Sequence, residues 1–286
     1  NCGHCEYCEA GKPTHCRGTL ANATTPFIRD GNPVYNFAAS SGFTEYTLVN
    51  QHQAIVIDPT IPFTSACLIA CGVVTGVGAV FNRAKVRPGD TAAVFGVGGI
   101  GLNVIQGLRI AGATRIIAVD LFDQKESLAR EFGATDFINP KNITGDIASA
   151  IRQLIPDSEK SDTGPFSAGG VDWSFECTSN PEVLDDAVRS LNWGGNCIIL
   201  GVPAENASYP MPILHLAYVD RGIMGCRYGS TRPHLDIPKY VDLYLDGRLK
   251  LDELVTQQYK LEDYQLAMDD LAAGRLARGV FTLDAN

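Results

Sequence analysis

Four cysteines near the start of the chain have the spacing of a metal site. Cys2, Cys5, Cys8 and Cys16 form the pattern C-x2-C-x2-C-x7-C. This spacing lets consecutive thiolates converge from one loop, and four thiolates complete a tetrahedral shell around Zn2+ with no open position. We therefore predict a structural zinc site. An Fe–S cluster is a weaker alternative because there is no second Cys group, and disulfides are weaker because the nine Cys are an odd number.

A glycine-rich segment has the pattern of a nucleotide-binding turn. Gly96, Gly98 and Gly101 form G-x-G-x-x-G, with Gly99 as an additional glycine. The motif follows the apolar segment Thr91–Phe95 and opens a predicted helix, which is the context that dinucleotide binding requires. The first glycine permits a tight turn, the second lets a pyrophosphate approach the backbone, and the third allows close packing of helix and strand. A glycine-rich turn without nucleotide is the alternative.

An acidic residue ends the next predicted strand. Asp120 follows Gly101 by nineteen positions. A carboxylate there accepts hydrogen bonds from the ribose hydroxyls and repels a 2′-phosphate, which favours NAD as the cofactor. No Arg directly follows Asp120, and we expect Lys125 to contact the adenosine ribose.

From about Gly89 onward, predicted strands alternate with predicted helices. The strands are Thr91–Val97, Arg115–Asp120, Asp136–Ile138, Val171–Glu176 and Gly195–Leu200, and the helices are Gly101–Ala111, Gln124–Phe132, Ile147–Ile155 and Pro181–Leu191. Strands separated by helices of this length pair in parallel through crossover connections. The pattern predicts an α/β fold with a doubly wound parallel sheet.

The two ends of the chain have another character. The part before Gly89 predicts a β-rich, loop-rich domain, and we expect the tail after Gly225 to return to it. The tail carries predicted helices at Pro238–Leu245 and Leu261–Ala273 and a strand at Gly279–Leu283, and Asp157–Gly170 is predicted to be a surface loop.

Composition excludes several classes of partner. There are 23 Lys and Arg against 32 Asp and Glu, a net charge of −9 that repels nucleic acids and anionic lipid surfaces. Two uncharged stretches, Pro59–Asn82 and Thr91–Leu108, contain too many Gly, Pro, Ser and Thr residues to predict membrane spans. We expect no nucleic-acid partner, no membrane insertion and a reducing, cytoplasmic setting.

Together the motifs resemble those of the zinc-dependent alcohol dehydrogenases of the medium-chain dehydrogenase/reductase superfamily, particularly the branch with liver-type and glutathione-dependent formaldehyde dehydrogenases. The likeness covers essentially the whole chain. It rests on the four-Cys lobe, a C-G-x-x-T-G-x-G segment beginning at Cys71, the G-x-G-G-x-G turn and the acidic residue after the second strand. It implies a Rossmann NAD-binding domain at 73–225, and a GroES-like catalytic domain formed by 1–72 with the returning tail 226–286.

The resemblance also assigns roles that the residues alone do not. Read alone, Cys71 is a buried structural thiol; the resemblance makes it a ligand of the catalytic zinc. The resemblance places Thr75 near the nicotinamide, although capping a helix is an alternative role. Gly201 and Val202 would line the nicotinamide pocket, and Arg278 would contact the pyrophosphate. A turn glycine and a surface charge are the alternatives for Gly201 and Arg278.

The remaining cysteines match no ligand position. We expect buried, inert thiols at Cys67, Cys177, Cys197 and Cys226.

The activity that the resemblance implies is hydride transfer between an alcohol or aldehyde and NAD, with a catalytic zinc in the intact protein. Simple primary alcohols and aldehydes are the first choice of substrate, and the thiol adduct used by formaldehyde dehydrogenases is the second. A nucleotide-binding, zinc-stabilised scaffold without turnover is a further alternative. In the family, a strand within Pro210–Gly225 pairs with its twin, so we expect a homodimer or homotetramer.

In the family, the other catalytic zinc ligands, a Cys and a His, stand upstream of the four-Cys lobe, whereas this chain begins with Asn1. We therefore expect an N-terminally incomplete catalytic domain. A polypeptide of residues 1–286 should hold about one zinc, bind NAD weakly and oxidise no alcohol, and an upstream-extended form should hold about two and turn over. Elemental analysis and ethanol oxidation test this. Comparable ethanol oxidation by the two forms would contradict the role of Cys71.

Overall fold

The computed structural model describes residues 1–19, 24–155 and 166–283, and the chain forms two compact units. One unit comprises 1–69, 231–246 and 251–286, and the other comprises 70–230 and 247–250. The predicted loop Asp157–Gly170 lies largely outside the described residues.

The second unit is built around a parallel sheet of six strands. These are β3 (Thr91–Phe95), β4 (Arg115–Val119), β5 (Asp136–Ile138), β6 (Val171–Glu176), β7 (Leu191–Ile199) and β8 (Gly222–Gly225). Their order across the sheet is β5-β4-β3-β6-β7-β8, and every neighbouring pair is parallel. The order reverses between β3 and β6, which is the dinucleotide-binding arrangement of a doubly wound sheet. The predicted fold class is confirmed.

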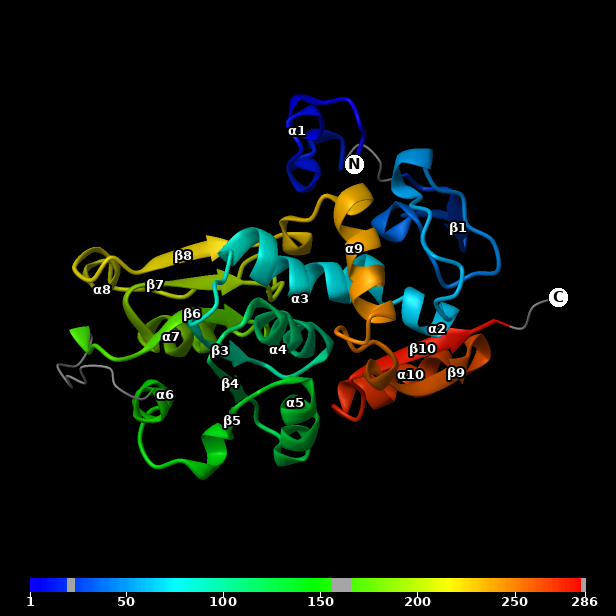
Figure 1. Cartoon of the computed structure of the whole chain (residues 1–286). Coiled ribbons are helices and arrows are strands. Elements are labelled where there is room, and N and C mark those ends of the chain that lie inside the picture. Colours follow the sequence, from blue (N-terminus) through cyan, green and yellow to red (C-terminus); the bar gives the residue numbers. More distant parts are fainter. Residues whose placement is uncertain (20–23, 156–165, 284–286) are drawn as a thin grey trace. The chain divides into compact units, whose positions relative to one another are not determined.

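Helices cover both faces of this sheet. α4 (Gly99–Ala111) packs beside α5 (Glu126–Phe132), and α6 (Ile147–Leu154) packs beside α7 (Pro181–Arg189). Figure 1 shows the two pairs on opposite sides of the sheet. The unit also contains the short helix α8 (Leu214–Ala217).

Alternating side chains of the strands form the core. On β3, Ala93 and Phe95 belong to the cluster that packs with α6 and α7, while Ala92 and Val94 point to the other face. All four are at most 1% exposed, as expected for a parallel sheet covered on both sides. The other buried members of the cluster are Ile117, Val119, Ile138, Ile151, Ile155, Val171, Ala187, Val188, Leu191 and Cys197.

One strand begins earlier than the pattern predicted. The predicted strand Gly195–Leu200 is β7, which starts at Leu191. Its first residue pairs with Val171 of β6, with a bulge before the next pair at Trp173 and Asn196. Cross-strand pairing and a bulge thus carry the strand through glycines that, by sequence alone, indicate a turn.

The first unit has smaller elements. It contains α1 (Glu6–Glu9), α2 (Phe63–Ala66), α9 (Pro233–Leu245), α10 (Tyr264–Ala272), the antiparallel pair β1 (Phe27–Arg29) and β2 (Asn32–Val34), and the parallel pair β9 (Val255–Lys260) and β10 (Arg278–Thr282).

A long apolar helical stretch runs from Phe63 to Ala84. It includes α2, π-helical segments at Ile69–Val73 and Ala79–Ala84, and α3 (Val74–Gly78) between them. By length and composition alone it could cross a membrane, but 67% of its most apolar window is buried within the protein. A Cβ placed on Gly76 of α3 would lie 2.5 Å from the Cβ of Asn103 in α4, so the two helices are in close contact. A core helix passes the same test, so the stretch is weak evidence for a membrane span.

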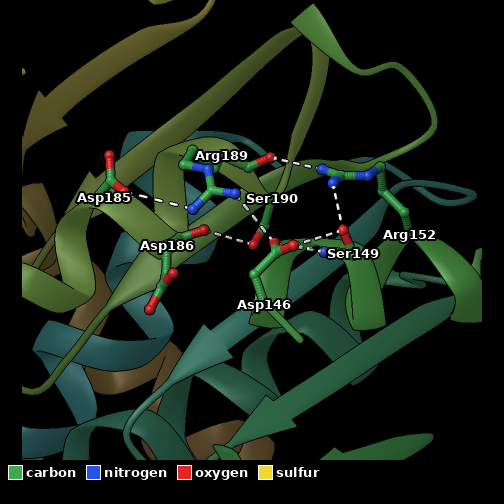
Figure 2. A network of polar contacts seen from close by, with 7 residues as sticks. All are labelled: Asp146, Ser149, Arg152, Asp185, Asp186, Arg189 and Ser190. Atoms are coloured by element: carbon green, nitrogen blue, oxygen red, sulfur yellow. Dashed lines mark hydrogen bonds and ion pairs between the residues drawn. The ribbon is translucent and has the colours of Figure 1, made fainter. Parts of the chain in front are cut away.

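A polar network ties α6 to α7 (Figure 2). Asp146 caps the start of α6 by accepting hydrogen bonds from the Ser149 amide at 3.0 Å and the Ser149 hydroxyl at 2.8 Å. Arg189, at the end of α7, donates to the same carboxylate at 3.2 Å. Arg152 of α6 forms a second connection between the two helices by donating to the Arg189 carbonyl at 3.1 Å. The network therefore fixes how the two helices lie against each other.

The network also sets the charge of Asp146. Partial burial acts to raise the pKa of this carboxyl, but the hydrogen bonds from Ser149 and the nearby Arg189 and Arg152 outweigh it, and the pKa is lowered. The lowered pKa favours the ionised form in the folded protein. Its contribution to stability is complete above the ordinary Asp pKa of about 3.9 and disappears as pH falls through the lowered value.

Removing this cap should destabilise the protein. Asp146→Ala should lower the free energy of unfolding by about 1 kcal/mol at neutral pH, and the difference from wild type should shrink below about pH 4. Asp185→Ala is the matched control, since its carboxylate also faces Arg189 but at 3.7 Å, and we expect a loss below about 0.5 kcal/mol. Urea unfolding at several pH values measures both. Equal losses for the two variants would contradict the assignment of Asp146 as the cap.

Candidate functional site

The four predicted metal ligands lie together in the first unit. The Sγ atoms of Cys2, Cys5, Cys8 and Cys16 are all within 4.8 Å of one another, and those of Cys5 and Cys8 are 3.6 Å apart. Zn–S bonds of about 2.3 Å in a tetrahedron require sulfur atoms roughly 3.8 Å apart, so the cluster fits a zinc ion. Among the described residues it is the only group of three or more possible donors.

Local structure explains how so short a segment gathers four thiols. Cys5 precedes α1 and Cys8 lies within it, so that one helical turn brings both to the same side. Gly18 passes behind the cluster, where a Cβ would lie 3.0 Å from the Cβ of Cys2. The Cys2 amide donates to the Cys16 sulfur at 3.2 Å.

Without metal the Cys5 and Cys8 thiols differ in pKa. The backbone amides of Cys8 and Arg17 lower the pKa of the Cys5 thiol to about 6. Burial raises the pKa of the Cys8 thiol to about 11. When a divalent cation binds, all four thiols lose their protons, because all four sulfurs bind the metal as thiolates.

The glycine-rich turn lies in the second unit between β3 and α4. Gly96 has a φ of +93°, and a Cβ on Gly101 would lie 1.9 Å from the Gly96 carbonyl oxygen. Both positions therefore require glycine. A Cβ on Gly98 would meet no atom within 4 Å, so this position leaves open space at the start of α4. Open space beside the amide groups of a helix N-terminus suits a pyrophosphate.

Asp120 is joined to this turn. It directly follows β4, it is buried, and its Oδ2 accepts a hydrogen bond of 2.7 Å from the Val97 amide. The same oxygen accepts from Lys125 Nζ at 3.0 Å, and Oδ1 accepts from the Phe122 amide at 3.2 Å. The turn, the carboxylate and the lysine that the sequence singled out are thus one constellation, with Gly99 as the first residue of α4.

A second buried carboxylate at this edge of the sheet was not predicted. Glu176 ends β6, is 3% exposed, and accepts hydrogen bonds from the Thr178 amide and hydroxyl and from the Ser179 amide. A Cβ on Gly201 would lie 2.5 Å from its Oε2. An acidic residue at the end of an apolar strand, as at Asp120, was the signal that could have found it.

The other predicted residues are less closely grouped. Cys71 is exposed in the π-helical segment Ile69–Val73, and Thr75 is buried one turn later in α3. The expectation of buried thiols was therefore wrong for Cys71 and for Cys67, which is also exposed. Gly201 and Val202 follow β7, and Val202 is 87% exposed. Arg278 opens β10 in the first unit, where its carbonyl accepts a hydrogen bond from Thr256. No contact in the structure tests the zinc-binding or cofactor-binding roles predicted for these residues, so the roles stay predictions.

A catalytic zinc at Cys71 would need further ligands. Within the described residues, no group of three or more possible donors includes Cys71. The residues that the structure describes therefore do not by themselves fit a second zinc, and we derive no reaction step through one.

Comparisons with known proteins agree with these features. The family described as zinc-binding dehydrogenase matches residues 99–246. The S-(hydroxymethyl)glutathione dehydrogenase of Paracoccus denitrificans is 39% identical over 98% of this chain and 75% of its own length. The alcohol dehydrogenase class-3 of Cereibacter sphaeroides is 37% identical over 96% of this chain and 71% of its own length.

Solved structures give the same result. An alcohol dehydrogenase zinc-binding domain protein from Burkholderia ambifaria superposes with a TM-score of 0.87 at 33% identity. The benzyl alcohol dehydrogenase of Acinetobacter calcoaceticus gives 0.87 at 28% identity. Each match covers 99% of this chain and 75% of the other.

Loss of one thiol should remove the metal. Cys8→Ser should lower the zinc content by about one ion per chain and destabilise the lobe, because a short segment with little apolar content depends on metal for its order. Cys226→Ser, a half-buried thiol outside the cluster, is the control and should retain zinc. Elemental analysis measures both. Equal zinc in Cys8→Ser and wild type would contradict the structural site.

Proposed function

Because the chain belongs to the zinc-dependent alcohol dehydrogenase family of the medium-chain dehydrogenase/reductase superfamily, we propose that the protein transfers hydride between an alcohol or aldehyde and NAD. The observation that carries the choice of cofactor is the buried hydrogen bond between the glycine-rich turn and the Asp120 carboxylate. Bound NAD supplies the hydride acceptor.

The chain's own residues bind and orient this cofactor. Amide groups at the start of α4 would hold the pyrophosphate in the space beside Gly98, and Asp120 with Lys125 would hold the adenosine ribose. We assign Thr75, Gly201 and Val202 to the nicotinamide end and Arg278 to the pyrophosphate. Fixing the cofactor at several points lowers the entropic cost of bringing the reacting atoms together.

The metal assignments have different support. We assign Cys2, Cys5, Cys8 and Cys16 to a structural zinc, which the sulfur distances support. Cys71 is proposed as one ligand of a catalytic zinc, on the family resemblance alone. The other ligands stand upstream of the four-Cys lobe in the family.

Further parts of the proposal concern organisation. We retain the division into 1–72, 73–225 and 226–286, a cytoplasmic location and a homodimer or homotetramer. The edge position of β8 supports assembly: it pairs with β7, and among the described strands nothing pairs with its other side. An unpaired edge strand favours a partner strand.

A thiol-dependent formaldehyde dehydrogenase is the second candidate. It is favoured by the 39% identity to the S-(hydroxymethyl)glutathione dehydrogenase of Paracoccus denitrificans. Assays of NADH formation with ethanol, with benzyl alcohol, and with formaldehyde plus glutathione distinguish the two. We expect NADH from a simple alcohol without thiol. Turnover only with glutathione would select the second candidate, and no turnover with any substrate would contradict both.

Asp120 should control coenzyme preference. Charge-assisted hydrogen bonds contribute about 1.5 to 3 kcal/mol, so Asp120→Ala should weaken NAD binding about ten- to hundredfold and ease the exclusion of NADP. Glu126→Ala removes the same charge from the first turn of α5 and should change neither dissociation constant. Titration with both coenzymes measures the effect. An unchanged NAD to NADP ratio in Asp120→Ala would remove Asp120 from the site.

A further inference from the structure

A buried carboxylate lies where the ends of three strands of the second unit meet. Glu176 ends β6, which pairs with β3 on one side and with β7 on the other. The turn after β3 contains Gly96, the turn after β6 spans 177–180, and Gly201 follows β7. The strand order reverses between β3 and β6, and a doubly wound sheet binds its ligand at such a point. Glu176 therefore stands on one side of the glycine-rich turn, and Asp120, which follows β4, stands on the other.

One oxygen of this carboxylate holds the turn at 177–180. Glu176 Oε1 accepts hydrogen bonds from the Thr178 amide, the Thr178 hydroxyl and the Ser179 amide. Ser179 has a φ of +66°, in the left-handed region that residues other than glycine rarely adopt. The Asn180 amide donates to the Thr178 hydroxyl oxygen at 3.1 Å, and Asn180 caps the start of α7. Glu176 thus supports an unfavourable backbone conformation that leads directly into a helix.

On the β3 side, this turn lies against the glycine-rich turn. The Cys177 amide donates to the Phe95 carbonyl at 2.9 Å, and a Cβ on Gly96 would lie 2.9 Å from the methyl carbon of Thr178. The Gly96 amide, however, donates to the Val119 carbonyl of β4 at 2.8 Å. The glycine-rich turn therefore keeps an anchor that is independent of Glu176.

On the β7 side, the same turn lies against Gly201. The amides of Leu200 and Gly201 both donate to the Glu176 carbonyl, at 2.9 and 3.0 Å. A Cβ on Gly201 would lie 2.4 Å from the Ser179 nitrogen and 2.5 Å from Glu176 Oε2. The Gly201 backbone therefore packs directly on the turn that the carboxylate holds.

We propose that Glu176 is a positioning residue for the nicotinamide half of the cofactor: by holding Ser179 in the left-handed conformation, it sets the place of the Gly201 backbone before the cofactor binds. The inference rests on the proposed function, because it takes the nicotinamide to lie at Gly201 and Val202. A wall that is formed in advance lowers the ordering cost of binding. Removal of the carboxylate leaves three donors without their acceptor, so the turn must rearrange to pair them. The adenosine half should not respond, because Asp120 and the glycine-rich turn are joined to β4.

Binding of adenosine 5′-monophosphate and of NAD, which adds the nicotinamide half, tests the proposal. Calorimetry gives both dissociation constants for wild type, Glu176→Ala and Glu176→Gln. We expect Glu176→Ala to bind NAD about tenfold more weakly, as for the loss of one charge-assisted hydrogen bond, and the monophosphate within about twofold of wild type. Glu176→Gln should bind both within about threefold of wild type, because its amide oxygen accepts from the same donors.

Two further variants define the cause. Glu182→Ala removes the same charge from an exposed position in the first turn of α7 and should change neither constant. Thr178→Val removes the hydroxyl and its two hydrogen bonds but keeps a methyl carbon against Gly96. It should weaken NAD about threefold and the monophosphate less than about twofold. This milder change decides the question if Glu176→Ala does not fold.

The outcomes separate this inference from the function on which it rests. Failure of wild type to bind either nucleotide would contradict the proposed function and the inference with it. If wild type binds both, then unchanged NAD binding by Glu176→Ala and Thr178→Val, or equal weakening of both nucleotides, would overturn the role of Glu176 alone. Glu176→Gln as weak for NAD as Glu176→Ala would also overturn it, because the charge and not the geometry of the turn would then be the cause.

Discussion

The hydrogen bond from the Val97 amide to the Asp120 carboxylate is the contact on which the candidate nucleotide site depends. It joins the turn after β3 to the end of β4 at 2.7 Å in a buried setting. Parallel pairing of β3 with β4 brings the two ends together, and Gly101 lets α4 start close enough for the turn to fit. A buried carboxylate must keep its donors, so the position of Asp120 and the shape of the turn fix each other.

The segment that carries the four Cys ligands does not depend on an apolar core for its order. Its four thiols lie within fifteen positions of one another, and Cys16 is the only buried residue between positions 1 and 18. Burial of apolar surface thus contributes little there, and binding of metal by four thiolates would supply most of the folding free energy. The nucleotide unit, by contrast, is stabilised by a sheet buried on both faces. The two sites therefore should respond to different perturbations, one to chelation and the other to loss of packing.

Much of this architecture follows from local sequence pattern. Extended segments that alternate with helical segments predicted β3, β4, β5 and β6 within two residues, and cysteine spacing predicted the metal cluster. Features set by distant contacts were not predictable. Gln106, for example, accepts a hydrogen bond from the Lys250 amide 144 positions away, which keeps residues 247–250 in the nucleotide unit. No periodic pattern in the sequence predicts a hydrogen bond between residues so far apart in the chain.

The central claim is that one edge of the sheet, from the glycine-rich turn to Asp120, binds the adenosine and pyrophosphate of a dinucleotide. A crystal structure of the protein with NAD bound tests it most directly. The account predicts electron density for the pyrophosphate beside Gly98 at the start of α4, and ribose hydroxyls within hydrogen-bonding distance of Asp120. Density for the adenosine elsewhere on the protein, with Asp120 bonded only to Val97, Phe122 and Lys125, would contradict it.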